Sequence, residues 1–384
     1  MKKIVVILAQ PIEENTSSAI RVSSILRELP FCGYQTICYS PYANNVDSSN
    51  LNLFNIEIRR YGEENYVKKI KERLEKEGDL RTKTLNFIYK LYKKIDIFGA
   101  SLIYLKYTKK IMKEIKNEHP DILLTFSDPI TAHIIGCKCK KYASKYIQQW
   151  GDPLASDIIA KVGLPIWIRK IIEKMIIKNA DRICYVSPLT YIEQKNIYKK
   201  YADRMIFLPT PSLNYENTSP NKHKKLKIGY FGNYHSIARN ITPLYEAATI
   251  NLDVELYLIG NSDLHLEKEE NIIIIDRMSQ EKLEEYLYEM DILVCIMNHK
   301  GNQIPGKMYH YAGSYKEIMI IKDGEYGNDI EEYFSKFKHY TFVNNSREEI
   351  NLVLNKYIRN GIPKRKPVLE FSSEVIAKEL LENL

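Results

Sequence analysis

Short apolar runs alternate with helical patterns, and this rhythm restricts the fold of the chain more than any other feature. Strands that are separated by helices predict a parallel sheet covered on both faces, because parallel strands need long crossover connections. In the first half, the strand-like runs occupy residues 3–9, 35–39, 121–126, 146–150 and 182–186. Helical patterns occupy residues 17–29, 129–143 and 165–180. The first half is therefore expected to form a doubly wound α/β domain.

The rhythm stops at residues 209–225, which are rich in Pro, Asn and Ser and end in a basic run, as linkers often do. It then restarts. Strands are expected at residues 227–231, 254–259, 271–275, 292–297 and 318–321, and helices from about residue 240, at 279–290 and at 372–381. A chain of 384 residues is also long for a single core. We therefore expect an acceptor domain at 1–210, a second domain at 226–365 and a terminal helix within 366–384.

Cysteines and hydropathy exclude several classes of protein. The six cysteines include no Cys-x-x-Cys pair, which favours reduced structural thiols over a disulfide framework or a zinc site. The apolar run at residues 4–9 is too short for a signal peptide, and no run reaches the ~18 residues of a membrane span. We expect a cytoplasmic protein that would meet a membrane only at its surface, at the inner face.

A basic segment accounts for the whole net charge of +8. Residues 66–118 hold fifteen Lys and Arg against seven Asp and Glu. Its lysines alternate with apolar residues at helical spacing and include Lys90, Lys93, Lys94, Lys106, Lys109, Lys110 and Lys113. This pattern predicts amphipathic helices that dock on an anionic membrane surface. The alternative is an ordinary solvated face. Nucleic acid is not an expected partner, because no reader motif is present.

A candidate phosphate site follows the strands of the second half. Gly232 comes directly after the strand at 227–231 and would let a ligand approach the backbone closely. Arg239 follows near a helix start, and Gly306 with Lys307 opens another helix. Cations and helix N-termini at the carboxyl ends of parallel strands suit a diphosphate. The alternative is that these are turn glycines and solvated cations.

Two motifs resemble the donor-sugar domain of GT-B glycosyltransferases, especially family 4. One is the turn Gly229-Tyr230-Phe231-Gly232, and the other begins Pro305-Gly306-Lys307-Met308-Tyr309-His310-Tyr311 and continues to Lys316-Glu317-Ile318. The run HPDILLTFSDP in the first half is a weaker likeness. The resemblance implies two Rossmann-like domains facing across a cleft, with the terminal helix crossing back onto the first. It also implies a nucleotide-sugar donor and neither a metal nor a cofactor.

The resemblance also suggests which residues hold the donor. The implied donor-binding residues are Gly232, Asn233, Arg239, Asn302, Pro305, Gly306, Lys307 and His310. Many members of the family carry two glutamates eight positions apart, of which the second holds the ribose. Here Asn302 and His310 stand at those places, so the ribose would be read by groups other than carboxylates. Glu317 stands where the family has a proline.

Acceptor-side candidates come from two Asp-Pro corners that end strands of the first half. Asp128 precedes Pro129 and is also expected to cap the helix that starts there. Asp152 follows the strand at 146–150 and serves either a catalytic or a turn-forming role. His133 lies one turn into the helix, where it would approach the acceptor or serve only the packing of the helix.

Together these features predict a metal-independent glycosyltransferase of hexosyltransferase type. It would move a sugar from a nucleotide-sugar to a lipid-linked glycan in the synthesis of a capsule or another bacterial surface polysaccharide. Asp152, Arg239 and Lys307 are the expected catalytic residues. No Asp-x-Asp motif is present. Two alternatives stay open: a nucleotide-sugar epimerase with the same fold, and a non-catalytic binding module on a decayed glycosyltransferase fold.

Overall fold

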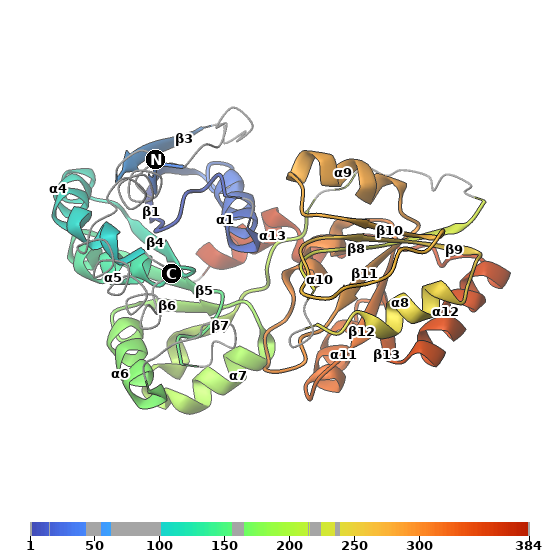
Figure 1. Ribbon diagram of the computed structural model, residues 1–384. Helices are drawn as coiled ribbons and strands as arrows, with labels where there is room; N and C mark the ends of the chain where they lie inside the picture. Colours follow the sequence, from blue (N-terminus) through green and yellow to red (C-terminus); the bar gives the residue numbers. More distant parts are fainter. Residues whose placement is uncertain are drawn as a thin grey trace, which may run out of the picture. The chain divides into compact units, whose positions relative to one another are not determined.

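The chain forms two compact units, each built on its own sheet (Figure 1). The computed structural model describes residues 2–14, 16–43, 55–62, 101–155, 165–213, 215, 224–234 and 239–382. The first unit comprises Met1–Pro209 and Ile376–Leu384, and the second comprises Thr210–Val375. Residues 66–100 of the predicted basic segment lie outside the described residues.

The sheet of the first unit is parallel throughout. Its strands are β1 (Lys2–Ile7), β2 (Tyr34–Pro41), β3 (Ile56–Tyr61), β4 (Ile122–Phe126), β5 (Lys145–Trp150), β6 (Arg182–Tyr185) and β7 (Met205–Phe207). They lie in the order β3-β2-β1-β4-β5-β6-β7. Val5 of β1 pairs with Ile37 on one side and with Leu123 on the other, so the direction of winding reverses between β1 and β4.

Helices cover both faces of this sheet. They are α1 (Ser17–Glu28), α4 (Thr108–Glu118), α5 (Thr131–Cys139), α6 (Ile166–Ile177), α7 (Pro188–Ile197) and α13 (Ser373–Leu381), with 3-10 turns η2 (Ser101–Tyr107), η3 (Lys140–Tyr142) and η4 (Lys199–Arg204). Thr16 caps α1, because its hydroxyl accepts a hydrogen bond from the Ala19 amide at 3.1 Å. Side chains of α1 and α13 share one core beneath the sheet, and those of α4, α5, α6 and η4 share the core on the other face.

The second unit repeats the plan with six parallel strands. These are β8 (Leu226–Phe231), β9 (Val254–Ile259), β10 (Ile272–Ile275), β11 (Ile292–Ile296), β12 (Glu317–Lys322) and β13 (Tyr340–Asn344), in the order β10-β9-β8-β11-β12-β13. Its helices are α8 (Thr242–Thr249), α9 (Gln280–Glu289), α10 (Gly306–His310), α11 (Gly327–Ser335) and α12 (Arg347–Asn360), with 3-10 turns η5 (Tyr311–Gly313) and η6 (Leu369–Phe371). Helices α8 and α12 pack together against one face, and α9 covers the other (Figure 1).

Both strand orders are those of Rossmann-like, doubly wound sheets, which confirms the predicted fold class. One local prediction was wrong. Helix α5 begins at Thr131 with Ile130 at its N-cap, so Asp128 does not cap it. Asp128 has a positive φ of 69° and lies two residues outside the cap position, which places its carboxylate elsewhere. Among the described helices, none combines the length and the apolar character of a membrane span.

Candidate functional site

The second unit gathers polar groups where its strand order reverses. The reversal lies between β8 and β11, which pair side by side. The chain leaves β8 through Gly232 and Asn233, and leaves β11 through Met297 and Asn298. Loops that leave neighbouring parallel strands in opposite directions open a crevice at the carboxyl edge of the sheet, where doubly wound folds bind ligands.

Lys307 lies against Gly232 in this crevice. A Cβ atom added to Gly232 would lie 2.9 Å from Cε of Lys307. The absence of a side chain at Gly232 therefore leaves room for the Lys307 side chain. Gly260, which directly follows β9, packs against the same turn. A Cβ atom there would lie 2.2 Å from the carbonyl oxygen of Gly232. The two glycines therefore differ in what they contact: Gly232 faces a flexible side chain, and Gly260 faces backbone.

Arg239 is held across the crevice by a residue of the neighbouring loop. Its Nε donates to Oδ1 of Asn298 at 3.0 Å, and the Nδ2 of Asn298 donates to the carbonyl of Gln303 at 3.2 Å. Asn298 thereby ties Arg239 to the loop that leads into α10. A guanidinium presents its donors in the fork that suits phosphate oxygens.

Several positive charges influence one another here. Burial lowers the pKa of Lys307 to about 8; the Cys295 thiol counteracts this shift, and the charges of Arg239 and Arg277 contribute to it. A lysine in a cluster of cations favours an anionic ligand, because the ligand's charge relieves their mutual repulsion. The Lys307 ammonium also lies 5.9 Å from the centroid of the Tyr311 ring. The cluster of Arg239, Arg277 and Lys307 is called the cation cluster below.

The other predicted donor residues lie around the cation cluster. Asn233 follows Gly232; its carbonyl accepts from the Tyr230 hydroxyl at 3.1 Å, and its Oδ1 accepts from the Asn261 amide at 3.1 Å. Asn302 lies in the loop between β11 and α10, and Pro305 and Gly306 lead into that helix. Helix α10 has only five residues before it tightens into η5, so its dipole is small.

His310 ends α10 and is buried, with 5% of its surface exposed. Its carbonyl accepts from the Leu213 amide at 3.0 Å, which fastens the residues just after the unit boundary to this helix. Its role as a ribose ligand stays a prediction, as do the roles of the other donor candidates.

Glu317, which stands where family-4 glycosyltransferases have a proline, has a structural function. Its carboxylate is buried and accepts from the Arg365 Nε at 2.6 Å and from the Tyr357 hydroxyl at 2.9 Å. Arg365 and Tyr357 also contact the Thr341 hydroxyl, each at 2.9 Å. The departure from the family pattern thus joins β12 to β13, to α12 and to the segment that follows α12.

In the first unit, the acceptor-side candidates lie at the corresponding edge. Arg21 of α1 contacts Asp128 with an Nη2–Oδ2 distance of 3.2 Å, across the place where that sheet reverses. The Gly151 amide donates to the Ser127 hydroxyl at 2.7 Å, which joins the corners that follow β4 and β5. Asp128 and the half-buried Asp152 therefore belong to neighbouring corners of one edge.

His133 is placed differently from the two aspartates. Its ring is fully buried, and its centroid lies 4.5 Å from that of Trp150. Nδ1 lies 2.7 Å from the Thr125 hydroxyl. Burial lowers the pKa of His133 to about 3, so the ring stays neutral at any ordinary pH. This environment is typical of a structural histidine and favours the packing interpretation.

Sequence reasoning missed Arg21, Arg277 and Asn298. Arg277 and Asn298 each stand two positions after the end of a strand, β10 and β11 respectively. The rule that selected Gly232 would also have selected them. Arg21 had no local signal, because its partner Asp128 is 107 residues away. Within the described ranges, no three His, Cys, Asp or Glu side chains are grouped so that they would hold a metal ion.

Comparisons with known proteins bear on the fold. No protein-family model matches the sequence, and no curated protein sequence matches it. Among solved structures, a glycosyltransferase from Rickettsia africae is 14% identical, with a TM-score of 0.63 and all of both chains covered. HepE of Anabaena, solved with UDP and glucose, is 10% identical, with a TM-score of 0.61 over 99% of this chain and 95% of HepE.

A third similar structure belongs to a different class of enzyme. The UDP-GlcNAc 2-epimerase of Neisseria meningitidis, solved with UDP-GlcNAc, is 10% identical, with a TM-score of 0.56 over 100% of this chain and 99% of the epimerase. These likenesses extend over the whole chain. The chain accordingly has the GT-B fold with its two Rossmann-like domains.

Proposed function

We propose that this chain is a glycosyltransferase that uses a nucleotide-sugar, and that the cation cluster holds the donor's diphosphate. The cluster is the observation that carries the proposal. A diphosphate brings two negative charges, and Lys307 beside Gly232 with Arg239 on Asn298 supplies cations at the carboxyl edge of β8 and β11. Cations that are already in place would stabilise the diphosphate as it departs.

The GT-B neighbours support a nucleotide-sugar as the donor. HepE was solved with UDP and with UDP-glucose, and S. aureus MnaA with UDP. From the resemblance to family 4 we further propose hexosyl transfer without a metal. The acceptor proposed is a lipid-linked glycan of a capsule or a similar bacterial surface polysaccharide, for which the neighbouring lipopolysaccharide outer core galactosyltransferase WaaB is a precedent. Asp152 and Asp128 are the proposed acceptor-side residues of the first domain.

Calorimetric titration with UDP, GDP, ADP and CMP tests the donor site directly. Arg239→Ala and Lys307→Ala should each weaken binding of the preferred nucleotide by about 1.5–3 kcal/mol, the range for a charged hydrogen bond. Arg347→Ala and Lys336→Ala are matched controls, because they remove the same side chains elsewhere in the second unit, and both should leave affinity unchanged. Equal affinities in all four variants would remove the cation cluster from the donor site.

Two other functions fit parts of the same structure. An epimerase is favoured by similar structures from Neisseria meningitidis and Listeria monocytogenes, and it would interconvert a UDP-sugar without any acceptor. Incubation with UDP-GlcNAc alone distinguishes an epimerase from a glycosyltransferase. An epimerase changes the configuration of the sugar, whereas a glycosyltransferase transfers no sugar without an acceptor. Failure to bind any of the four nucleotides would instead favour the non-catalytic binding module.

A further inference from the structure

Helix α6 exposes an apolar stripe that the core of the first unit does not require. Trp167, Ile171 and Met175 follow one another at intervals of four residues and are 64%, 51% and 57% exposed. Positions four apart lie on the same face of a helix. Ile166 at the helix start is also exposed. Such a stripe points to a partner, because a helix in water normally turns polar residues outward.

The opposite face of α6 is already occupied. Ile176 and Ile177 belong to the core that α6 shares with α4, α5 and η4 on one face of the sheet. Glu173 is fully buried, and its Oε2 accepts from the Ala155 amide at 3.0 Å. These contacts fix the rotation of α6, so the stripe cannot turn inward without breaking them.

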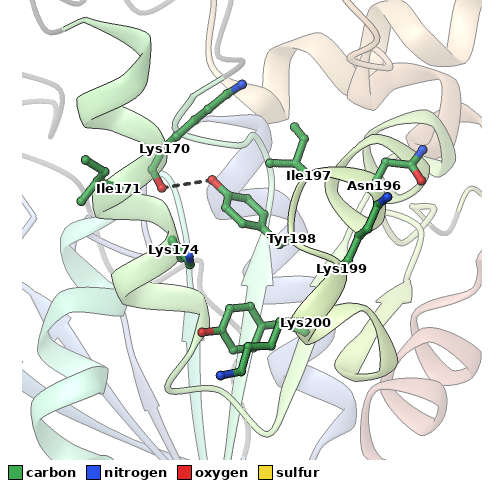
Figure 2. A pocket seen from close by; sticks show the side chains of 9 residues that line it. Lys170, Ile171, Lys174, Asn196, Ile197, Tyr198, Lys199 and Lys200 are labelled. Atoms are coloured by element: carbon green, nitrogen blue, oxygen red, sulfur yellow. Dashed lines mark hydrogen bonds between the residues drawn. The ribbon is translucent and has the colours of Figure 1, made fainter.

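Lysines lie beside the stripe and around a pocket next to it. Lys170, Lys174 and Lys178 are exposed on α6 and alternate with the apolar residues at the same spacing. A pocket of about 510 Å³ opens between α6 and the segment from α7 to η4 (Figure 2). It is lined by Lys170, Lys174, Lys199 and Lys200, together with Ile171, Asn196, Ile197, Tyr198 and Tyr201.

The walls of the pocket are joined by a hydrogen bond, and its lining is positively charged. The Tyr198 hydroxyl donates to the Lys170 carbonyl at 3.2 Å and so joins its two walls (Figure 2). No Asp or Glu is present among the described residues that line it. Four exposed lysines therefore line a space large enough for a phosphate group, directly beside exposed Ile171.

We propose that α6 and η4 form a docking surface for a bilayer with anionic headgroups. Trp167, Ile171 and Met175 enter the interface between headgroups and acyl chains, and the pocket lysines receive the lipid phosphates. The combination selects this partner, because an acidic protein would not need the apolar stripe and a neutral apolar partner would not need the lysines. In sequence, this docking surface is distinct from the basic segment at residues 66–118.

The inference deepens the proposed function and rests on it only for the lipid-linked acceptor. Docking itself needs no donor. Loss of vesicle binding and loss of nucleotide binding are therefore separate outcomes.

Cosedimentation with vesicles tests the docking surface in the full chain. Vesicles of phosphatidylcholine alone are compared with vesicles that also contain phosphatidylglycerol. The variant with Lys170, Lys174, Lys199 and Lys200 changed to Gln should bind anionic vesicles about tenfold more weakly or worse. The control changes Lys109, Lys110, Lys113 and Lys116 of α4 to Gln, which removes the same charge from the basic segment. Because the basic segment is itself predicted to dock on a membrane, this variant should bind anionic vesicles more weakly than the unchanged protein but more strongly than the variant of the pocket lysines, and both variants should keep their nucleotide affinity.

Trp167 provides an independent optical signal. The chain has two tryptophans, and Trp150 is fully buried, so a blue shift of the emission on adding anionic vesicles reports Trp167. Trp167→Ser should abolish the shift and weaken binding. Four results would overturn the proposal: no vesicle binding, equal binding to neutral vesicles, loss of binding only in the α4 control, or a dimer in sedimentation velocity that Trp167→Ser dissociates.

Discussion

Lys307 is expected to make nucleotide affinity depend on pH. Its pKa is lowered to about 8, and only the charged form attracts a diphosphate. The ammonium is present below this pKa and is lost as pH rises through it. The dissociation constant for the preferred nucleotide should therefore increase about tenfold between about pH 7 and about pH 9. Calorimetry across this range measures it.

Lys307→Arg is the matched control for this titration. Arginine stays charged throughout the range, so the variant should bind with little dependence on pH. A flat profile in the unchanged protein, or an equally steep one in the arginine variant, would assign the pH dependence to another group.

The two glycines of the donor turn should respond differently to the same substitution. Both glycines have a φ of 156°, so alanine is strained at either position. Gly232→Ala adds a Cβ against the flexible end of Lys307, which can move away. This variant should lose nucleotide affinity by several-fold and change its melting temperature less. Gly260→Ala places a Cβ against the carbonyl of Gly232, where backbone must shift, so it should lower the melting temperature clearly. Thermal unfolding and titration of both variants check this, and a reversed order of effects would contradict it.

At the scale of single residues, the sequence predicts positions better than contacts. Gly232 and Lys307 were found because motifs mark them, and the structure places them together. The partner of Arg239 is Asn298, 59 residues away, which no local pattern reveals. Asp128 shows the opposite error: a local capping rule was applied, but Arg21 of a distant helix provides the partner of its carboxylate.

Among the elements, β12 is expected to depend on one buried ion pair. Arg365→Met would leave the Glu317 carboxylate buried without its cation, which typically destabilises a protein by about 3–5 kcal/mol. Glu317→Gln added to Arg365→Met should recover much of this loss, because the amide carries no charge to bury. Denaturant unfolding of the two variants provides the measurement. A double variant no more stable than Arg365→Met would show that the charge of Glu317 is not the cause.

Strands were predictable where they read as a continuous apolar run. Strands β4 and β11 have only buried residues and read as continuous apolar runs, and both were predicted. Strands β3, β7 and β13 were not predicted. Each lies at the edge of a sheet, where partly exposed positions interrupt the apolar run. The fourth edge strand, β10, was predicted although it is partly exposed, because it is an unbroken run of four isoleucines. The local pattern therefore identifies a strand whose apolar run is continuous and misses an edge strand whose run is interrupted.

For the whole molecule, the end of α13 should stabilise the first unit although it follows the second in sequence. Leu380 is fully buried in a core that also contains Val22 and Ile25 of α1. Leu380→Ala should destabilise that unit by about 2–5 kcal/mol. Hydrogen exchange should show lost protection in α1 and β1 and unchanged protection in β8 and β11. Lys378→Ala, at an exposed position of the same helix, is the control. Exchange that rises only in the second unit would contradict the assignment.

The return of residues 376–381 to the first unit has a consequence for biosynthesis. Residues 1–209 of the first unit are synthesised before any residue of the second, yet the core around Ile4, Val22 and Ile25 still lacks Ile376 and Leu380 at that moment. The second unit, whose residues 210–375 are contiguous, can fold as soon as it emerges. Apolar surface of the first unit therefore stays uncovered for as long as residues 210–375 are being made.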